Sequence, residues 1–323
     1  MAEIVTALAP LVERINNIMT ALIARDEEIV ARIGAYSFEG GGKRLRPVMF
    51  CLVTEALGAP LTDERVEIAA SFEFLHMATL LHDDIVDLSE LRRGQASAHL
   101  VFGVPEAVLA GDYLLSKAAA LGAETDSLEC VRAMAGVVAA LSLGELVQLN
   151  SRRRTELPEP EYFTIIFRKT AVLMEGSTRT AAILAGADEP LKAAAANYGR
   201  LLGLAFQIMD DILDYQSDRE TFGKPVGHDL SEGKITLPFI RAREALRGDR
   251  RARLCELAGQ EIIGPEDYAE IGRLVAEGGG VESARVKAEE LAREAAAALA
   301  VFPPSPARSQ LEALAEYTVA RKN

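Results

Sequence analysis

The stretch His76–Asp87 (HMATLLHDDIVD) places three aspartates at the end of an apolar run, and this pattern decides the fold. The apolar residues recur at helical spacing, so the sequence predicts a helix here. At about 100° per residue, with His76 at zero, Asp83 falls near 340°, Asp84 near 80° and Asp87 near 20°. The helix therefore gathers its acidic side chains on one face.

A second apolar run, Gln207–Asp214 (QIMDDILD), repeats the pattern. With Gln207 at zero, the same count of about 100° per residue puts Asp210 near 300°, Asp211 near 40° and Asp214 near 340°. Clustered carboxylates repel one another and are costly to bury without a counter-charge. Mg²⁺ takes oxygen ligands and combines a few carboxylates with substrate phosphates. The two motifs therefore predict two facing carboxylate sets that hold Mg²⁺ against a diphosphate.

Composition narrows the class of protein. The chain has 323 residues, of which 49% are hydrophobic, enough for a large core. Its net charge of −13 argues against nucleic acid as a partner, because no basic surplus exists to neutralise phosphates. The same charge would repel a diphosphate, so a diphosphate site needs local cations and metal.

The cysteines and the N-terminus indicate the compartment. Cys51, Cys130 and Cys255 are scattered and lack any CxxC spacing, which is typical of free thiols in a reducing cytosol. Met1–Ile4 lacks the basic segment and apolar stretch of a signal peptide. No uninterrupted apolar run approaches the roughly 18 residues of a membrane span. We expect a cytoplasmic protein without a transmembrane segment.

Nearly every other segment also has a helical pattern. An apolar stripe from Val66 to Leu81 leads into the first acidic motif, with Thr62 as a candidate N-cap. Further helices are predicted over Glu106–Ala123, Cys130–Leu149, Ala193–Tyr215 and Val281–Leu299. Thr164–Phe167 is too short to argue for a sheet, and the breaks between segments are brief. The sequence predicts one all-α domain over residues 1–323, with about ten or more helices.

The segment Gly40–Pro47 places three glycines before three cations, Lys43, Arg44 and Arg46. Glycines let backbone N–H groups approach an anion closely, while lysine and arginine supply charge and forked donors. Pro47 suits the start of the following helix. The alternative is a flexible turn whose cations are solvated.

Other cations give weaker signals. Arg92 and Arg93 follow the first acidic motif and suit either a phosphate or a solvated helix end. His76 shares a face with Asp83, but a single histidine in a helix is more often structural. The basic run at residues 152–154 is predicted to be a solvated helix end. Taken singly, Lys169, Thr170, Lys224 and Lys234 indicate little.

Together these segments resemble the signature blocks of the trans-polyprenyl diphosphate synthases. The resemblance rests on residues 41–47, 80–87, 91–94, 206–214 and 227–234, which occur in the family's order and spacing. A single Asp-Asp-x-x-Asp motif would be weak evidence, because terpene cyclases share it. The resemblance implies an all-α bundle of the isoprenoid synthase type around a central cavity, and usually a homodimer.

The resemblance also implies roles for individual residues. Several Mg²⁺ ions would be bound by Asp83, Asp84, Asp87, Asp210, Asp211 and Asp214. Isopentenyl diphosphate would be held by Lys43, Arg46, His76 and Arg93. The allylic diphosphate would be held by Arg92, Lys169, Thr170, Gln207, Lys224 and Lys234. Among these, the six aspartates and Arg92 are the candidate catalytic residues.

The expected reaction is a head-to-tail condensation. Metal and cations would stabilise the departing diphosphate, and the double bond of isopentenyl diphosphate would attack the allylic carbocation in a dry, apolar cavity. Two alternatives remain open at this stage. A class I terpene cyclase would use similar aspartates, although its second motif usually mixes Asn, Ser and Glu. A regulatory subunit of a hetero-oligomeric synthase would tend to lose acidic residues that this chain has kept.

Product length is expected to depend on Ala78 and Thr79, which lie about one turn before Asp83. Short-chain members of the family typically carry aromatic side chains at this level of the cavity. Two small residues would leave the cavity open, so the resemblance implies a medium- or long-chain product. Such a product is consistent with peripheral membrane contact at its release.

Overall fold

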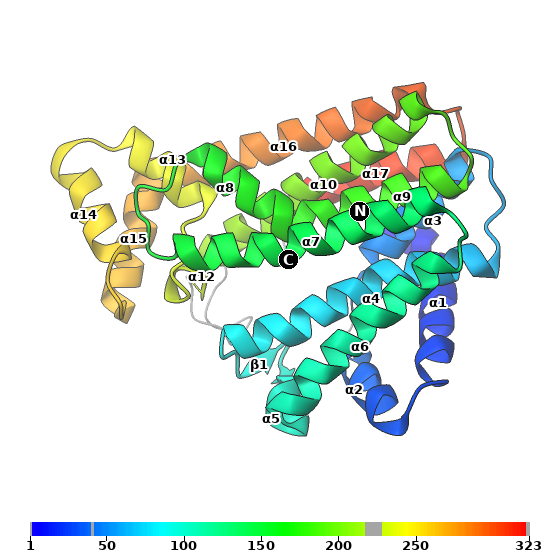
Figure 1. Cartoon of the computed structure of the whole chain (residues 1–323). Coiled ribbons are helices and arrows are strands. Elements are labelled where there is room, and N and C mark those ends of the chain that lie inside the picture. The colour runs from blue at the N-terminus through cyan, green and yellow to red at the C-terminus, as the bar shows by residue number, and fades with distance from the viewer. Residues whose placement is uncertain (1, 40–41, 217–227, 321–323) are drawn as a thin grey trace. The chain divides into compact units, whose positions relative to one another are not determined.

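The computed structural model describes residues 2–39, 42–216 and 228–320, and helices account for most of them (Figure 1). The chain divides into two compact units. The first consists of Met1–Val138, Leu173–Gly199 and Ala298–Ala313, and the second of Ala139–Val172, Arg200–Ala297 and Leu314–Asn323. The single domain expected from the sequence stays a prediction.

The first unit is built around α4, the helix that carries the first acidic motif. Its elements are α1 (Ala2–Ile23), α2 (Glu28–Glu39), α3 (Leu45–Ala56), α4 (Asp63–Val86), β1 (Leu91–Arg92), β2 (Gln95–Ala96), α5 (Ala98–Phe102), α6 (Val104–Ala123) and α9 (Val172–Leu184). The short 3₁₀ segment η2 (Leu299–Val301) also belongs to it. Three of the described helices have several residues in each unit: α7 (Leu128–Ser151), α10 (Glu189–Gln216) and α17 (Pro306–Ala320).

The start of α4 follows from its sequence. The side chain of Thr62 accepts a hydrogen bond from Arg65 N at 3.4 Å, as the predicted N-cap should. Asp63 and Glu64 occupy the first turn, where negative charge complements the helix dipole. The helix packs against α1, α3 and α6, so it is buried on several sides. This burial explains why most residues of α4 between Val66 and Leu81 are apolar.

The packing of α6 on α4 is close beside the acidic motif, and the two helices run side by side in Figure 1. A Cβ atom at Gly111 would lie 2.2 Å from His82 Nε2, so a larger residue there would force the His82 ring to move. His82 Nε2 in turn lies 3.0 Å from the carbonyl oxygen of Val108. The residue before Asp83 is therefore held by the backbone of α6.

The second unit contains the part of α10 that carries the second acidic motif. Its other elements are α8 (Glu159–Ile166), η1 (Phe167–Ala171), α12 (His228–Ser231), α13 (Leu237–Ala245), α14 (Gly248–Ala258), α15 (Pro265–Glu277) and α16 (Gly280–Ala298). The segment η1 is a π-helical turn between α8 and α9. Such turns are rare and occur frequently at functional sites.

The prediction of an all-α fold is confirmed by the described residues. The four helices expected at residues 106–123, 130–149, 193–215 and 281–299 correspond to α6, α7, α10 and α16, with ends that differ by a few residues. The hairpin of β1 and β2 was not predicted, because each strand has only two residues. The π-helical turn was not predicted either.

One helix of the described chain, α7, is long and apolar enough to cross a membrane by length and composition. A core or interface helix of a soluble protein passes the same test, and α7 also makes polar contacts. Glu145 forms an ion pair with Lys169 at 2.8 Å, and Gln148 is buried. The expectation of no transmembrane segment stays a prediction.

Candidate functional site

Both acidic motifs lie at the C-terminal ends of their helices. Asp83 and Asp84 belong to the last turn of α4, and Asp87 is its C-cap residue. Neither α4 nor α10 has a basic residue in its last turn. The helix dipole is negative at this end, so carboxylates there are unfavourable unless cations approach them. Positive charge placed near either motif would therefore be stabilising.

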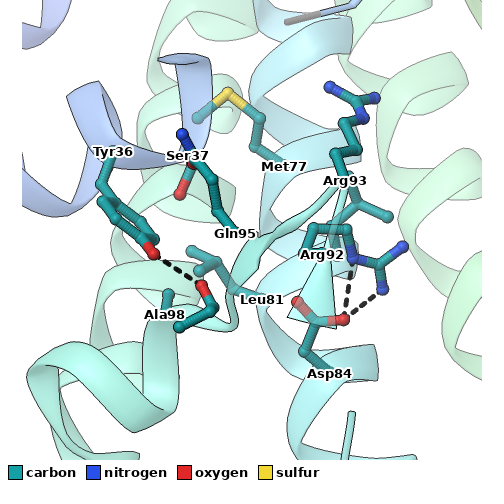
Figure 2. Close-up of a pocket in the computed structure, with 11 residues that line it drawn as sticks. Tyr36, Ser37, Met77, Leu81, Asp84, Arg92, Arg93, Gln95 and Ala98 are labelled. Carbon is teal, nitrogen blue, oxygen red and sulfur yellow. Dashed lines mark hydrogen bonds and ion pairs between the residues drawn. The ribbon is translucent and has the colours of Figure 1, made fainter. Parts of the chain in front are cut away.

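Burial separates the three aspartates of the first motif. Asp83 and Asp87 are partly exposed, whereas Asp84 is buried. The Asp84 carboxylate accepts a hydrogen bond from Arg92 Nε at 2.9 Å and a second one from Arg92 Nη2, as Figure 2 shows. A buried carboxylate bonded twice to one guanidinium is a charge-assisted pair. Asp84 therefore holds the Arg92 side chain at the first motif.

Arg92 and Arg93 belong to the hairpin that follows α4. Its register pairs Leu91 with Ala96 and Arg92 with Gln95, so Arg93 and Gly94 form the turn. Both have positive φ, 53° for Arg93 and 81° for Gly94. A two-residue hairpin turn favours this conformation, but it is uncommon for an arginine. Arg93 points away from Asp84 in Figure 2.

A cavity lies beside this hairpin in the first unit, and its space, together with the open solvent at its mouth, is about 470 Å³ (Figure 2). Tyr36 on α2 donates a hydrogen bond to the carbonyl oxygen of Ala96 at 2.6 Å, which ties α2 to the hairpin. The lining residues are Tyr36, Ser37, Met77, Leu80, Leu81, Asp84, Arg92, Arg93, Gln95, Ala96 and Ala98. The pair of Asp84 and Arg92 is therefore part of the cavity wall.

The segment before α3 is anchored by Arg44, for which the sequence suggested no separate role. Arg44 is buried, and its guanidinium forms an ion pair with the buried Glu73 at 3.1 Å. Its Nε donates to Asn16 Oδ1 at 2.8 Å, and its guanidinium carbon lies 5.3 Å from the centre of the Phe38 ring. Glu73 lies one turn before His76 on α4. A carboxylate one turn before a candidate site residue is the sequence signal that could have indicated a buried partner for Arg44.

Arg44 and Arg93 also come close to the glycine segment. A Cβ atom at Gly42 would lie 2.9 Å from Arg44 Nη1 and 3.3 Å from Arg93 Nη1. The predicted ligands Lys43 and Arg46 flank Arg44, Lys43 being exposed and Arg46 partly exposed. The structure therefore brings Gly42 close to Arg93 of the hairpin, which is consistent with the phosphate-site interpretation.

His76 lies among these cations. Burial is the main cause that holds the pKa of His76 well below its ordinary value, and the charges of Arg46 and Arg93 add to it. The imidazole is therefore neutral near pH 7. It can offer one hydrogen-bond donor and one acceptor to a ligand, but no charge.

Burial also separates the aspartates of the second motif. Asp210 and Asp214 are partly exposed, whereas only 3% of the Asp211 surface is exposed. Asp211 accepts hydrogen bonds from the Tyr162 hydroxyl at 2.6 Å and from Gln207 Nε2 at 2.9 Å. Burial raises the pKa of Asp211 well above its usual range, and the charge of Asp229 adds to the effect.

The predicted ligands Lys169 and Thr170 lie in the π-helical turn η1. Thr170 Oγ1 donates to Gln207 Oε1 at 2.7 Å, and Lys169 pairs with Glu145. Two glycines leave room for this turn. A Cβ atom at Gly203 would lie 2.5 Å from Ala171 Cα, and one at Gly144 would lie 2.7 Å from Arg168 Cβ.

The loop with Lys234 is tied to the second motif. Asp214 Oδ2 accepts a hydrogen bond from Asp229 N at 3.1 Å, and Lys234 N donates to the Asp229 carbonyl oxygen at 2.8 Å. The Lys234 ammonium forms an ion pair with Glu232. Lys224, another predicted ligand, lies outside the described residues.

The basic run at residues 152–154 follows the end of α7, and Arg154 is exposed, as the sequence predicted. Arg153, however, is not simply solvated. It has a φ of 60°, and its backbone N donates to the carbonyl oxygen of Gly233 at 2.7 Å. Its guanidinium also donates to the carbonyl oxygen of Gln260. The sequence did not indicate these partners because they lie far away along the chain. Arg153 instead supports the loop that carries Lys234.

Within residues 2–39, 42–216 and 228–320, no three His, Cys, Asp or Glu side chains gather closely enough to form a metal site by themselves. Mg²⁺ binds one or two carboxylates together with substrate phosphates and waters. The partly exposed aspartates of each motif, Asp83, Asp87, Asp210 and Asp214, are the oxygen donors that fit such a cation.

The chain is similar in sequence to a known protein family. A family model described as polyprenyl synthetase matches residues 27–275. Octaprenyl diphosphate synthase of Escherichia coli is 37% identical over 307 residues, which cover 95% of this chain and 94% of that protein. Short chain isoprenyl diphosphate synthase of Methanothermobacter thermautotrophicus is 36% identical over 301 residues, which cover 92% of this chain and 91% of that protein.

A solved structure is also similar over the whole chain. The polyprenyl synthase from Caulobacter crescentus, complexed with calcium and isoprenyl diphosphate, has a TM-score of 0.90 and 37% identity. The alignment covers 100% of this chain and 98% of that one.

The low pKa of His76 predicts a dependence of stability on pH. The unfolded state takes up a proton near pH 6.5 while the folded state stays neutral, so stability falls as the pH drops below about 6.5. We expect His76→Gln to flatten the plot of unfolding free energy against pH between about pH 7 and 5. Proton NMR checks the cause directly. A resonance that is missing in His76→Gln and titrates near pH 6.5 in the wild type would contradict it.

Proposed function

The chain belongs to the polyprenyl synthetase family, and from this premise we propose that it condenses isopentenyl diphosphate with an allylic diphosphate. The reaction is head to tail, and its product is a medium- or long-chain all-trans polyprenyl diphosphate. The observation that carries the proposal is the position of both aspartate motifs at negative helix ends, where positive charge is favoured. Asp84 holds Arg92 at the first motif, and Thr170 in the π-helical turn is bonded to Gln207 of α10, which bonds Asp211 of the second motif.

The protein's own groups bind and orient the two diphosphates in this proposal. Lys43, Arg46 and Arg93 hold isopentenyl diphosphate, with the neutral His76 as a hydrogen-bond partner. Arg92, Lys169, Thr170, Gln207, Lys224 and Lys234 hold the allylic diphosphate. Bound Mg²⁺ would supply charge neutralisation at the leaving diphosphate. The aspartates Asp83, Asp87, Asp210 and Asp214 are the residues that would hold it.

The chemistry needs no protein nucleophile. The allylic carbon loses its diphosphate, the double bond of isopentenyl diphosphate forms the new carbon–carbon bond, and a proton leaves the adduct. Fixed cations around the leaving group stabilise the developing charge without reorganising. The comparisons give no support to the alternatives of a terpene cyclase or a regulatory subunit, and both motifs keep all three aspartates.

A cytoplasmic location is part of the proposal. All three cysteines are free, which is typical of a reducing compartment. The product would carry a long apolar chain, so we also propose peripheral contact with a lipid surface at product release. Sedimentation with vesicles in the presence and absence of product would test this contact.

The proposed activity depends on a divalent cation and on one partly exposed aspartate in each motif. Purified protein with Mg²⁺, farnesyl diphosphate and isopentenyl diphosphate should form polyprenyl diphosphates, and EDTA should abolish the reaction. Asp83→Ala and Asp210→Ala should each lower turnover by about 10²–10³-fold, the cost of losing one electrostatic partner of the transition state. Product formation and its length are measured by chromatography.

The control for this test is Asp63→Ala, at the opposite end of α4. Asp63 is exposed and pairs with Arg14 at the surface, so its loss should leave turnover unchanged. Circular dichroism should show that all three variants are folded. Turnover that survives EDTA, or Asp83→Ala that is unfolded, would refute the assigned role.

The position of Thr79 leads to a prediction about product length. Thr79 is partly exposed, and its hydroxyl donates to the His76 carbonyl oxygen at 2.8 Å, whereas Ala78 is fully buried. We expect Thr79→Phe to shorten the product by several isoprene units and to leave the first condensation intact, because the diphosphate-binding residues keep their positions. Chromatographic sizing of the products measures the change.

The matched control is Thr79→Val, which removes the hydroxyl and keeps the volume. It should leave product length unchanged, because volume is the operative quantity. Ala78→Phe should shorten the product as well. Because its ring must displace packed neighbours, it should also lower the melting temperature. A wild-type product length in both phenylalanine variants would show that the growing chain does not pass this part of α4.

We also propose a homodimer, formed through the exposed face of α7. Leu128, Val131, Leu143 and Leu146 of this helix are all exposed, at helical spacing. Large exposed apolar faces mark interaction sites, and a two-fold symmetric dimer is the commonest way to cover one. The low charge of α7 and its high hydropathy are consistent with an interface helix.

Multi-angle light scattering tests the dimer. We expect twice the chain mass at micromolar concentration for the wild type. Leu146→Glu should give the monomer, because it places a charge in the interface. The control is Ile262→Glu, which adds the same charge at an exposed residue outside α7 and should stay dimeric. A monomeric wild type would contradict the proposal.

A further inference from the structure

The buried hydroxyl of Tyr162 has no role in the proposed reaction so far, although it lies next to the second acidic motif. Tyr162 is on α8, and only 2% of its surface is exposed. Its hydroxyl donates to Asp211 Oδ2 at 2.6 Å, and the other oxygen of this carboxylate accepts from Gln207. Gln207 then accepts from Thr170 in η1. A continuous chain of hydrogen bonds therefore joins Tyr162 to Thr170.

The hydrogen bonds in this network run in one direction. Asp211 accepts at both of its oxygens, at Oδ2 from the Tyr162 hydroxyl and at Oδ1 from Gln207 Nε2. Gln207 must turn its amide nitrogen toward Asp211, and its amide oxygen then faces Thr170. The amide nitrogen carries a second hydrogen besides the one given to Asp211. The Tyr162 hydroxyl, by holding Asp211, therefore fixes how Gln207 presents its amide.

The helix geometry explains why Tyr162 and Thr170, at the two ends of this chain of hydrogen bonds, both reach α10. Tyr162 and Thr170 are eight residues apart, which would place them about 80° apart on a straight α-helix. The π-helical turn η1 lies between them and includes Thr170, and its wider turn lowers the rotation per residue. Both side chains therefore face α10. Their partners Asp211 and Gln207 are four residues apart, on one face of that helix.

The same face of α10 continues to Gly203, one turn before Gln207. A Cβ atom at Gly203 would collide with the backbone of Ala171, so η1 packs directly on α10 at this point. Over about two turns, α10 contacts the segment through Gly203, Gln207 and Asp211. This contact holds η1, and with it Lys169, in one conformation.

We propose that Tyr162 is a positioning residue for the allylic diphosphate, acting through Asp211 and Gln207 on the Lys169–Thr170 pair of η1. The inference rests on the proposed function, since that function assigns the diphosphate to these residues. Hydrogen-bond networks of this kind restrict their members to one arrangement. Removing the Tyr162 hydroxyl should therefore loosen the allylic site and leave the isopentenyl diphosphate site unchanged.

The test is Tyr162→Phe, which removes only the hydroxyl. The matched control is Tyr198→Phe, because Tyr198 is also fully buried and its hydroxyl donates to the Leu311 carbonyl oxygen at 2.7 Å. We expect Tyr162→Phe to raise the KM of farnesyl diphosphate about tenfold, which corresponds to about 1.4 kcal/mol. The KM of isopentenyl diphosphate should not change, and Tyr198→Phe should alter neither constant.

Calorimetric binding of farnesyl thiolodiphosphate with Mg²⁺ gives a readout that needs no turnover. Its Kd should rise about tenfold in Tyr162→Phe and stay constant in Tyr198→Phe. A double-mutant cycle with Thr170→Val locates the effect. If Tyr162 acts through Thr170, the double variant should lose less affinity than the product of the two single losses.

Three results would overturn the inference. These are equal analogue affinity in Tyr162→Phe and Tyr198→Phe, equal changes in the KM of both substrates, and multiplicative losses in the double variant. Failure of the proposed function looks different, because the wild type would then make no polyprenyl product. The binding comparison would in that case still decide the role of Tyr162.

Discussion

Negative charge at the C-terminal ends of two helices is the constraint on which the rest of the site depends. The dipoles of α4 and α10 already make these ends negative, and each carries three aspartates. Such an arrangement is unstable unless cations or hydrogen-bond donors approach it. The hairpin arginine Arg92 and the Tyr162 hydroxyl are two of the groups that do so. The hairpin at the first motif and α8 at the second provide these partners.

The helices and the motifs were predictable, because both depend on local sequence. Apolar residues at helical spacing gave α6, α7, α10 and α16, and Thr62 was identified as the cap of α4. The family and the enzyme class were predictable for the same reason, since short ordered blocks carry them. The all-α fold class could be predicted from the helical spacing of apolar residues alone.

The partners of the site residues were not predictable, because they come from distant segments. Arg44 is 29 residues from Glu73, and Tyr162 is 49 residues from Asp211. No periodicity relates such positions. The π-helical turn was missed as well, since it depends on glycines of α7 and α10 that leave room for it. The misjudged Arg153 shows the same limit, because its partner Gly233 is on a remote loop.

The two motifs have the same pattern of aspartates, yet the structure uses their middle residues differently. Asp84 is paired with a guanidinium, so its charge is compensated within the protein. Asp211 receives hydrogen bonds from a hydroxyl and an amide, which are neutral donors, and the charge of Asp229 acts on it as well. Neutral donors stabilise a carboxylate without cancelling its field. Burial and the charge of Asp229 raise the pKa of Asp211, and the hydrogen bonds from Tyr162 and Gln207 oppose that rise, whereas Asp84 is held by the charge of Arg92.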